Sequence, residues 1–114
     1  MESSLKSPAP LARQTREAVA LLGQLIRVTR IERGMKIQEL ADRVGVSRDL
    51  IHRIEKGDPR CGIGVVFEAA TVLALPLFAK DPAGIADERA RLDEKLRLLP
   101  KAVHHKHGKV DDAF

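Results

Sequence analysis

Four polar side chains between positions 48 and 53 carry the hydrogen-bonding groups that can read the edges of DNA bases. Arg48 and Arg53 each have a forked guanidinium, which can donate two hydrogen bonds to a guanine. Asp49 can accept a hydrogen bond from cytosine, and His52 adds a further polar group nearby. The sequence therefore predicts a base-reading surface, and the alternative is a helix face that is merely solvated.

Two short helices must position these side chains. Apolar residues recur at helical spacing on both sides of Gly45, at Leu40, Ala41, Val44, Val46, Leu50, Ile51 and Ile54. The second helix has a start signal, because Ser47 can cap its first turn and Asp49 complements the positive end of the helix dipole. The pattern across residues 38–57 indicates a helix-turn-helix, whose second helix has the right size for the major groove.

The residues around this corner resemble a known family. The residues that carry the resemblance are Leu40-Ala41, Gly45-Val46-Ser47, Ile51 and Ile54-Glu55-Lys56-Gly57. Over about residues 22–77 the chain is similar to the Xre/Cro family of bacterial and phage regulators. The resemblance implies an all-α fold, a compact lambda-repressor-like bundle of four to five helices with flexible tails at both ends. It also implies a structural ion pair between Arg30 and Glu55, which places both residues in the scaffold.

The same resemblance points to residues that would hold the DNA backbone. The family's first motif helix usually begins with a capping Thr or Ser followed by Gln, whereas this chain has Lys36 and Ile37. Lysine still supplies a point charge for a phosphate, although the cap and the amide are missing. We expect phosphate contacts from Arg27, Lys36, Ser47, Lys56 and Arg60.

The chain divides by composition and periodicity into four segments. Residues 1–14 are predicted to be a disordered lead, 15–79 the DNA-binding domain, 80–99 a C-terminal helix, and 100–114 a flexible tail that is basic and then acidic. The C-terminal helix has a narrow apolar stripe made of Ile85, Arg89, Leu92, Leu96 and Leu99. Such a stripe needs a partner surface, and a second copy of the chain fits it. A second dimer surface stays open, namely the fourth helix with Leu77 and Phe78.

The second half of the chain carries a narrower likeness. The likeness is carried by Glu55 to Pro59, the helix beginning near Gly64, Asp81 to Gly84, Leu98 to Lys101 and an acidic end with a terminal Phe. These segments resemble those of helix-turn-helix proteins encoded beside HipA-like kinase toxins. The resemblance implies a repressor that binds an inverted-repeat operator as a homodimer and acts as the antitoxin of such a kinase. The alternatives are a stand-alone repressor without a toxin, and a protein-interaction module whose helix-turn-helix is a relic.

Composition sets further bounds on the function. The 114 residues carry a formal net charge of +4, and the sequence pI of about 9.6 agrees with double-stranded DNA as a partner. One cysteine, Cys61, excludes an internal disulfide, and no apolar run reaches the roughly 20 residues of a membrane span. With no secretory signal either, the sequence predicts a cytoplasmic protein.

The sequence shows no pattern of catalytic or cofactor chemistry. It has no His-Glu-x-x-His motif, no phosphate-binding glycine loop and no nucleophile with an evident base, so we predict that the chain is not an enzyme and needs no cofactor. Three histidines in the tail could bind a metal, but such clusters are more often solvated, and no metal site is predicted; they are His104, His105 and His107. Cys61 is interpreted as an inert residue rather than a redox switch.

Overall fold

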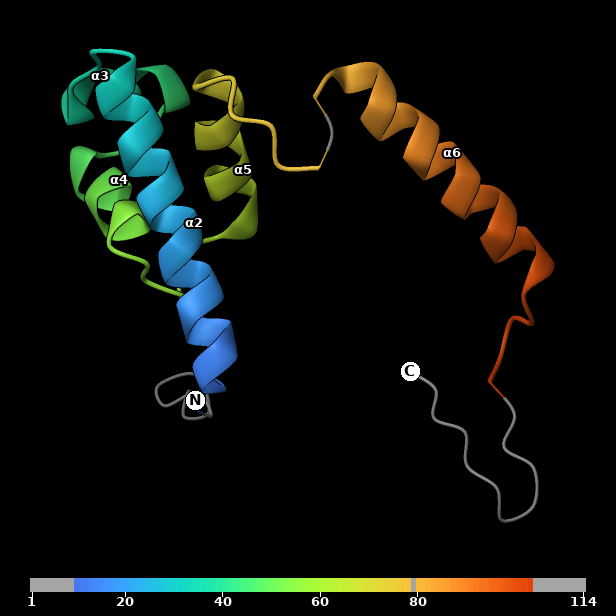
Figure 1. Ribbon diagram of the computed structural model, residues 1–114. Helices are drawn as coiled ribbons and strands as arrows, with labels where there is room; N and C mark the ends of the chain where they lie inside the picture. The colour runs from blue at the N-terminus through green and yellow to red at the C-terminus, as the bar shows by residue number, and fades with distance from the viewer. Residues whose placement is uncertain (1–9, 79, 104–114) are drawn as a thin grey trace. The chain divides into compact units, whose positions relative to one another are not determined.

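Helices alone make up the regular structure of the protein. The computed structural model describes residues 10–78 and 80–103, and these contain five α-helices and no strand (Figure 1). The helices are α2 (Arg13–Glu32), α3 (Ile37–Val44), α4 (Arg48–Glu55), α5 (Ile63–Val72) and α6 (Pro82–Leu98). The chain forms two compact units that divide between Leu77 and Phe78, the first holding α2 to α5 and the second holding α6. The prediction of an all-α fold with a helix-turn-helix is confirmed.

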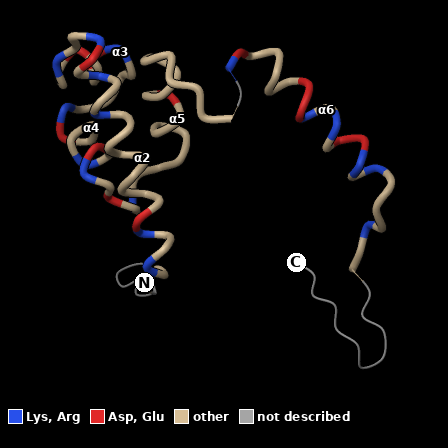
Figure 2. Tube along the Cα trace, viewed as in Figure 1, with Lys and Arg blue, Asp and Glu red and all other residues tan. Residues whose placement is uncertain are grey.

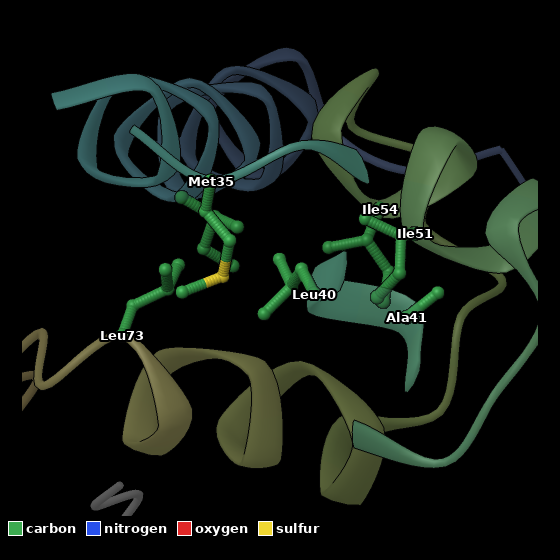
Figure 3. Close-up of a cluster of buried hydrophobic side chains, with 7 residues drawn as sticks. Met35, Leu40, Ala41, Ile51, Ile54 and Leu73 are labelled. Atoms are coloured by element: carbon green, nitrogen blue, oxygen red, sulfur yellow. The ribbon is translucent and has the colours of Figure 1, made fainter. Parts of the chain in front are cut away.

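An aliphatic core holds the first unit together. Its largest fully buried side chains are Ile26 of α2, Leu40 of α3, Ile51 of α4 and Leu73, which follows the last residue of α5. Met35, in the turn before α3, lies among the buried residues shown in Figure 3. In this unit α4 packs against α2 and α3, while α3 also packs against α5. Each helix therefore contributes to one shared interior and turns its other side outward.

The corner between α3 and α4 has the geometry that its residues predict. Gly45 ends α3 with a φ of 87°, a left-handed conformation that glycine adopts without steric cost. Ser47 then caps α4, because its hydroxyl accepts a hydrogen bond from the Leu50 amide at 3.1 Å. At the start of α3, Lys36 occupies the capping position and its side chain makes no capping bond. The departure from the family pattern at residue 36 is thus visible in the structure.

A buried ion pair joins α2 to the end of α4. The Nε and Nη2 atoms of Arg30 donate to the two carboxylate oxygens of Glu55, at 2.6 and 3.1 Å. The side chains of Arg30 and Glu55 are only 8% and 3% exposed. Nη1 of Arg30 also donates to the backbone carbonyl of Met35 at 2.8 Å. One guanidinium therefore connects α2, the turn before α3 and the last turn of α4.

Gly23 is the point of closest approach between α2 and α4. A Cβ atom at this position would lie 2.5 Å from the carbonyl oxygen of Ile54 and 2.8 Å from that of Glu55. Both neighbours are backbone atoms, so they cannot move away as a flexible side chain would. The two helices can therefore pack at this distance only because residue 23 has no side chain.

The second unit is built on α6, which begins as its sequence predicts. Asp81 caps the helix by accepting a hydrogen bond from the Gly84 amide at 3.0 Å, and Pro82 occupies its first turn. Two ion pairs run along the helix, from Arg91 to Glu88 and from Arg97 to Glu94. No residue of α6 is buried, so the large apolar side chains of the predicted stripe are exposed; these are Ile85, Leu92, Leu96 and Leu99.

Two of the predicted segments differ in their bounds from the observed helices. α2 begins at Arg13, two residues before the predicted domain start at 15, and α6 ends at Leu98. α5 ends at Val72 because Ala74 has a φ of 57°, a left-handed conformation that stops the helix. The predicted lead at 1–14 and tail at 100–114, including the three tail histidines, lie mostly outside the described residues.

Candidate nucleic-acid interface

An open hollow lies where the start of α3 meets the start of α4. Its volume is about 470 Å³, and it is lined by Ile37, Ser47, Arg48, Asp49 and His52. The side chains of Arg48, Asp49 and His52 are exposed. A guanidinium, a carboxylate and an imidazole thus converge on one surface, where they present donors and acceptors together. Three of the four residues predicted to read bases are brought together here.

The fourth predicted base reader, Arg53, is placed differently. Its Nε atom donates to an oxygen of Asp58 at 3.1 Å, and its side chain is 42% exposed. It does not line the hollow that Arg48 and His52 share. Arg53 follows His52 on α4, but one further residue rotates it by 100° around the helix axis, toward the turn that contains Asp58.

Asp58 binds two of the predicted DNA-contacting arginines at once. Its other oxygen accepts hydrogen bonds from the backbone amide and the Nε atom of Arg60, at 2.9 and 3.1 Å. The Arg60 side chain, the Arg60 amide and then the Arg53 side chain hold the pKa of Asp58 well below its usual range. In return, the Asp58 carboxylate raises the pKa of Arg60. The turn after α4 is therefore an ionic cluster of two cations and one anion.

The remaining predicted phosphate contacts are spread over several elements. Lys36 and Lys56 are exposed, at the start of α3 and at the end of α4 respectively. Arg27 is exposed on α2, in an open hollow that it shares with Leu21, Gln24, Leu25 and Val28. Ser47 uses its hydroxyl to cap α4 and also lines the hollow with Arg48. In Figure 2 the basic residues of the first unit lie on α2, α3, α4 and the turns, whereas α5 carries only one charged residue, Glu68.

Ile37 is a residue of this surface that the sequence did not single out as a contact. It was noted only because the family has an amide there, yet it is the first residue of α3 and it lines the hollow beside Arg48. An apolar side chain on a base-reading surface can contact the methyl group of thymine. Its position two residues after the Gly34-Met35 turn was the signal that could have identified it.

The described residues hold no cluster of metal ligands, and the cysteine among them is partly buried. No group of three or more His, Cys, Asp or Glu side chains in residues 10–78 and 80–103 is placed to hold a metal ion. Cys61 is partly buried, and this burial raises the pKa of its thiol, which lowers the fraction of reactive thiolate. Within the same residues, no helix is long and apolar enough to cross a bilayer.

Comparison with known proteins agrees with this geometry. A search of curated proteins found no match. A family model described as a helix-turn-helix domain matches residues 21–77, which is half of the chain and includes α3, α4 and α5. The chain therefore belongs to the helix-turn-helix domain family, within the Xre/Cro-like superfamily, and is a DNA-binding regulator.

Proposed function

We propose that this protein is a cytoplasmic, sequence-specific repressor that binds an inverted-repeat operator as a homodimer. The observation that carries the proposal is the hollow at the start of α4, where Arg48, Asp49 and His52 face outward together. In the major groove, Arg48 would donate to guanine, while Asp49 and His52 would accept from or exclude neighbouring bases. Two copies related by a two-fold axis would place their α4 helices about 34 Å apart, one turn of DNA.

Backbone contacts would supply most of the affinity and its salt dependence. The proposal assigns them to Arg27, Lys36, Ser47, Lys56 and Arg60. Lys36 and Lys56 sit at the two ends of the helix-turn-helix, so they flank the base-reading residues along the chain. Arg53 gives only its Nε atom to Asp58, and Arg60 gives Nε and Nη2, so each guanidinium keeps N–H donors that can contact DNA while the ion pairs are intact.

Two matched variants test the DNA-binding proposal. Arg48→Ala removes a base contact, so it should lose discrimination between the best site and a single-base mismatch by about 1–3 kcal/mol while binding to random DNA changes little. Lys56→Ala removes a phosphate contact, so it should weaken all sequences alike and reduce the slope of log affinity against log salt by about 1. Selection of binding sites from random duplexes, followed by anisotropy titrations at several salt concentrations, measures both. Loss of only nonspecific affinity in both variants would contradict the assigned reading surface.

We further propose that the regulator is the antitoxin of a HipA-like kinase. The support is the likeness of its turn after α4, its Asp81-Pro82 start of α6 and its Leu98-to-Lys101 segment to antitoxins of that class. A tagged pulldown from native cells, washed at moderate salt and analysed by mass spectrometry, tests this role. Stoichiometric recovery of a kinase supports it, whereas recovery of the chain alone with its operator DNA indicates a stand-alone repressor.

A further inference from the structure

The exposed stripe of α6 follows a heptad pattern. Ile85, Leu92 and Leu99 fall seven residues apart, at one core position, d. Arg89 and Leu96 occupy the other core position, a, between them. All four apolar members are between 44% and 66% exposed, so α6 itself does not bury this seam. Within the helix the seam runs from Ile85 to Leu96, a length of about 17 Å, and Leu99 follows directly after the last helical residue, Leu98.

The charges beside the seam distinguish between the two ways of pairing two copies. Glu88 and Lys95 flank it at the g positions, while Asp93 flanks it at an e position. In a parallel pair, g of one helix meets e of the other, so Glu88 would face the partner's Asp93 and like charges would repel. The two copies of Arg89 would also face each other in the core. Both contacts disfavour the parallel arrangement.

The antiparallel arrangement reverses both effects. There g meets g, and the register that overlaps α6 along its full length brings Glu88 opposite the partner's Lys95, twice by symmetry. In the same register Ile85 packs against the partner's Leu96, and Arg89 lies against the partner's Leu92 rather than against another arginine. The long stem of Arg89 can cover that leucine while its guanidinium reaches water and the adjacent Asp93 carboxylate. Shifting the register by one heptad either way would place Glu88 opposite Glu88 or Lys95 opposite Lys95.

We infer that α6 is the dimerisation element and that it pairs with α6 of a second copy as an antiparallel two-helix coiled coil. The paired register aligns Ile85 with the partner's Leu96 and Glu88 with the partner's Lys95. The inference rests on the proposed homodimer and specifies the face and direction through which it forms. A single polar core residue, Arg89, fixes the register at a cost in stability.

Two charge reversals on α6 test the pairing, with one of them as a matched control. Glu88→Lys and Glu94→Lys change the net charge equally, and each removes one ion pair to the arginine three residues ahead, Arg91 or Arg97. Only Glu88 flanks the seam, since Glu94 lies on the outer side of the helix at position f. Glu88→Lys should weaken the dimer about tenfold, because two attractive contacts become repulsive, whereas Glu94→Lys should change it by less than about threefold. The double variant Glu88→Lys with Lys95→Glu should return to near the wild-type value.

Sedimentation equilibrium of the full-length protein, without DNA and with interference optics, gives the dimer dissociation constants. A stronger dimer for Glu88→Lys would indicate a parallel pair and overturn the inference. Equal effects of the two single reversals, or a monomeric wild type, would overturn it as well. Because DNA is absent, these outcomes are independent of the Arg48→Ala and Lys56→Ala titrations, so failure of the pairing and failure of the proposed DNA binding can be told apart.

Disulfide trapping in a Cys61→Ser background gives a second measurement of direction. In a mixture of the single variants Ile85→Cys and Leu96→Cys, mild oxidation should form covalent dimers between the two variants, because these positions face each other in the antiparallel register. Leu92→Cys alone should not, since it faces the partner's Arg89. Efficient dimer formation by Leu92→Cys with itself and by Ile85→Cys with itself, without mixed dimers between Ile85→Cys and Leu96→Cys, would again indicate a parallel pair.

Discussion

Arg30 and Glu55, which are 25 residues apart in the chain, form a bidentate ion pair in the interior of the first unit. The pair is close to fully buried, so each charge depends on the other for its solvation. It fixes the last turn of α4 against α2, and α4 carries the residues proposed to read bases. The orientation of the candidate DNA-binding surface therefore depends on a contact made at the opposite end of the helix.

Removing one partner of this pair should be strongly destabilising. Glu55→Leu leaves the Arg30 guanidinium buried without its carboxylate, and the free energy of unfolding should fall by about 3–5 kcal/mol. Glu17→Leu is the control, because the Arg13–Glu17 pair is 84% and 66% exposed and its loss should cost less than about 1 kcal/mol. Urea unfolding followed by circular dichroism measures both. The double variant Arg30→Met with Glu55→Leu should recover part of the loss, and equal costs for the two single variants would contradict the argument.

Gly23→Ala should destabilise the protein although alanine is the better helix former. The added methyl group would meet the carbonyl oxygens of Ile54 and Glu55, so α2 and α4 must separate. We expect a loss of about 1–3 kcal/mol, where an unobstructed helical glycine would gain roughly 1 kcal/mol. Gly64→Ala in α5 is the matched control, since nothing lies within 4 Å of the added atom. Thermal unfolding should show a lower midpoint for the first variant and an equal or higher one for the second.

Lys36→Ser should change stability and DNA affinity in opposite directions. Serine can cap α3, where the Lys36 side chain makes no capping bond, and a gain of about 1 kcal/mol in unfolding free energy is expected. If Lys36 contacts a phosphate, the same substitution should weaken binding to every sequence and lower the salt slope by about 1. Urea unfolding and anisotropy titrations on the same preparation separate the two effects. Unchanged affinity together with higher stability would remove Lys36 from the proposed phosphate contacts.

The contribution of Asp58 to stability should disappear in acid. Its pKa is lower in the folded protein than in the unfolded chain, chiefly because Arg60 and then Arg53 bind the carboxylate. The stabilisation is therefore complete above the unfolded pKa of about 3.9 and is lost as the pH falls through that value toward the folded pKa. Unfolding free energies of wild type and Asp58→Asn should differ by a constant amount above about pH 5, and the difference should shrink steadily as the pH falls below about 4. A difference that stays constant down to pH 3 would show that the ion cluster does not form in solution.

Much of the first unit could be predicted because its signals are local. The helical spacing of Leu40, Ile51 and Ile54, the left-handed Gly45 and the capping Ser47 each specify a piece of backbone without reference to distant residues. The cap of α6 by Asp81 depends on equally local chemistry. Because these short-range preferences agree with one another, a helix-turn-helix can be recognised from a single sequence.

The features that were missed depend on distances between elements or on competition between partners. Gly23 looks like any residue inside a helix until the carbonyls of α4 are placed beside it. Arg53 stays a predicted base reader, but the sequence did not reveal that its Nε atom donates to Asp58, five residues ahead. Phe78 was expected to form part of a possible dimer surface; its side chain is 81% exposed, and its pairing with a second copy stays a prediction. A pattern of residue types cannot rank such competing contacts.

No residue of α6 is buried, so burial of apolar side chains does little to stabilise this helix in the monomer. An isolated helix of 17 residues is marginal in water, because its nucleation cost is offset only by propagation along a short length. Association would then supply the stabilisation that burial supplies elsewhere, so that folding of α6 and formation of the dimer are one event. The helical ellipticity of the protein should accordingly rise with its concentration, and the backbone amides of α6 should become protected from hydrogen exchange over the same range.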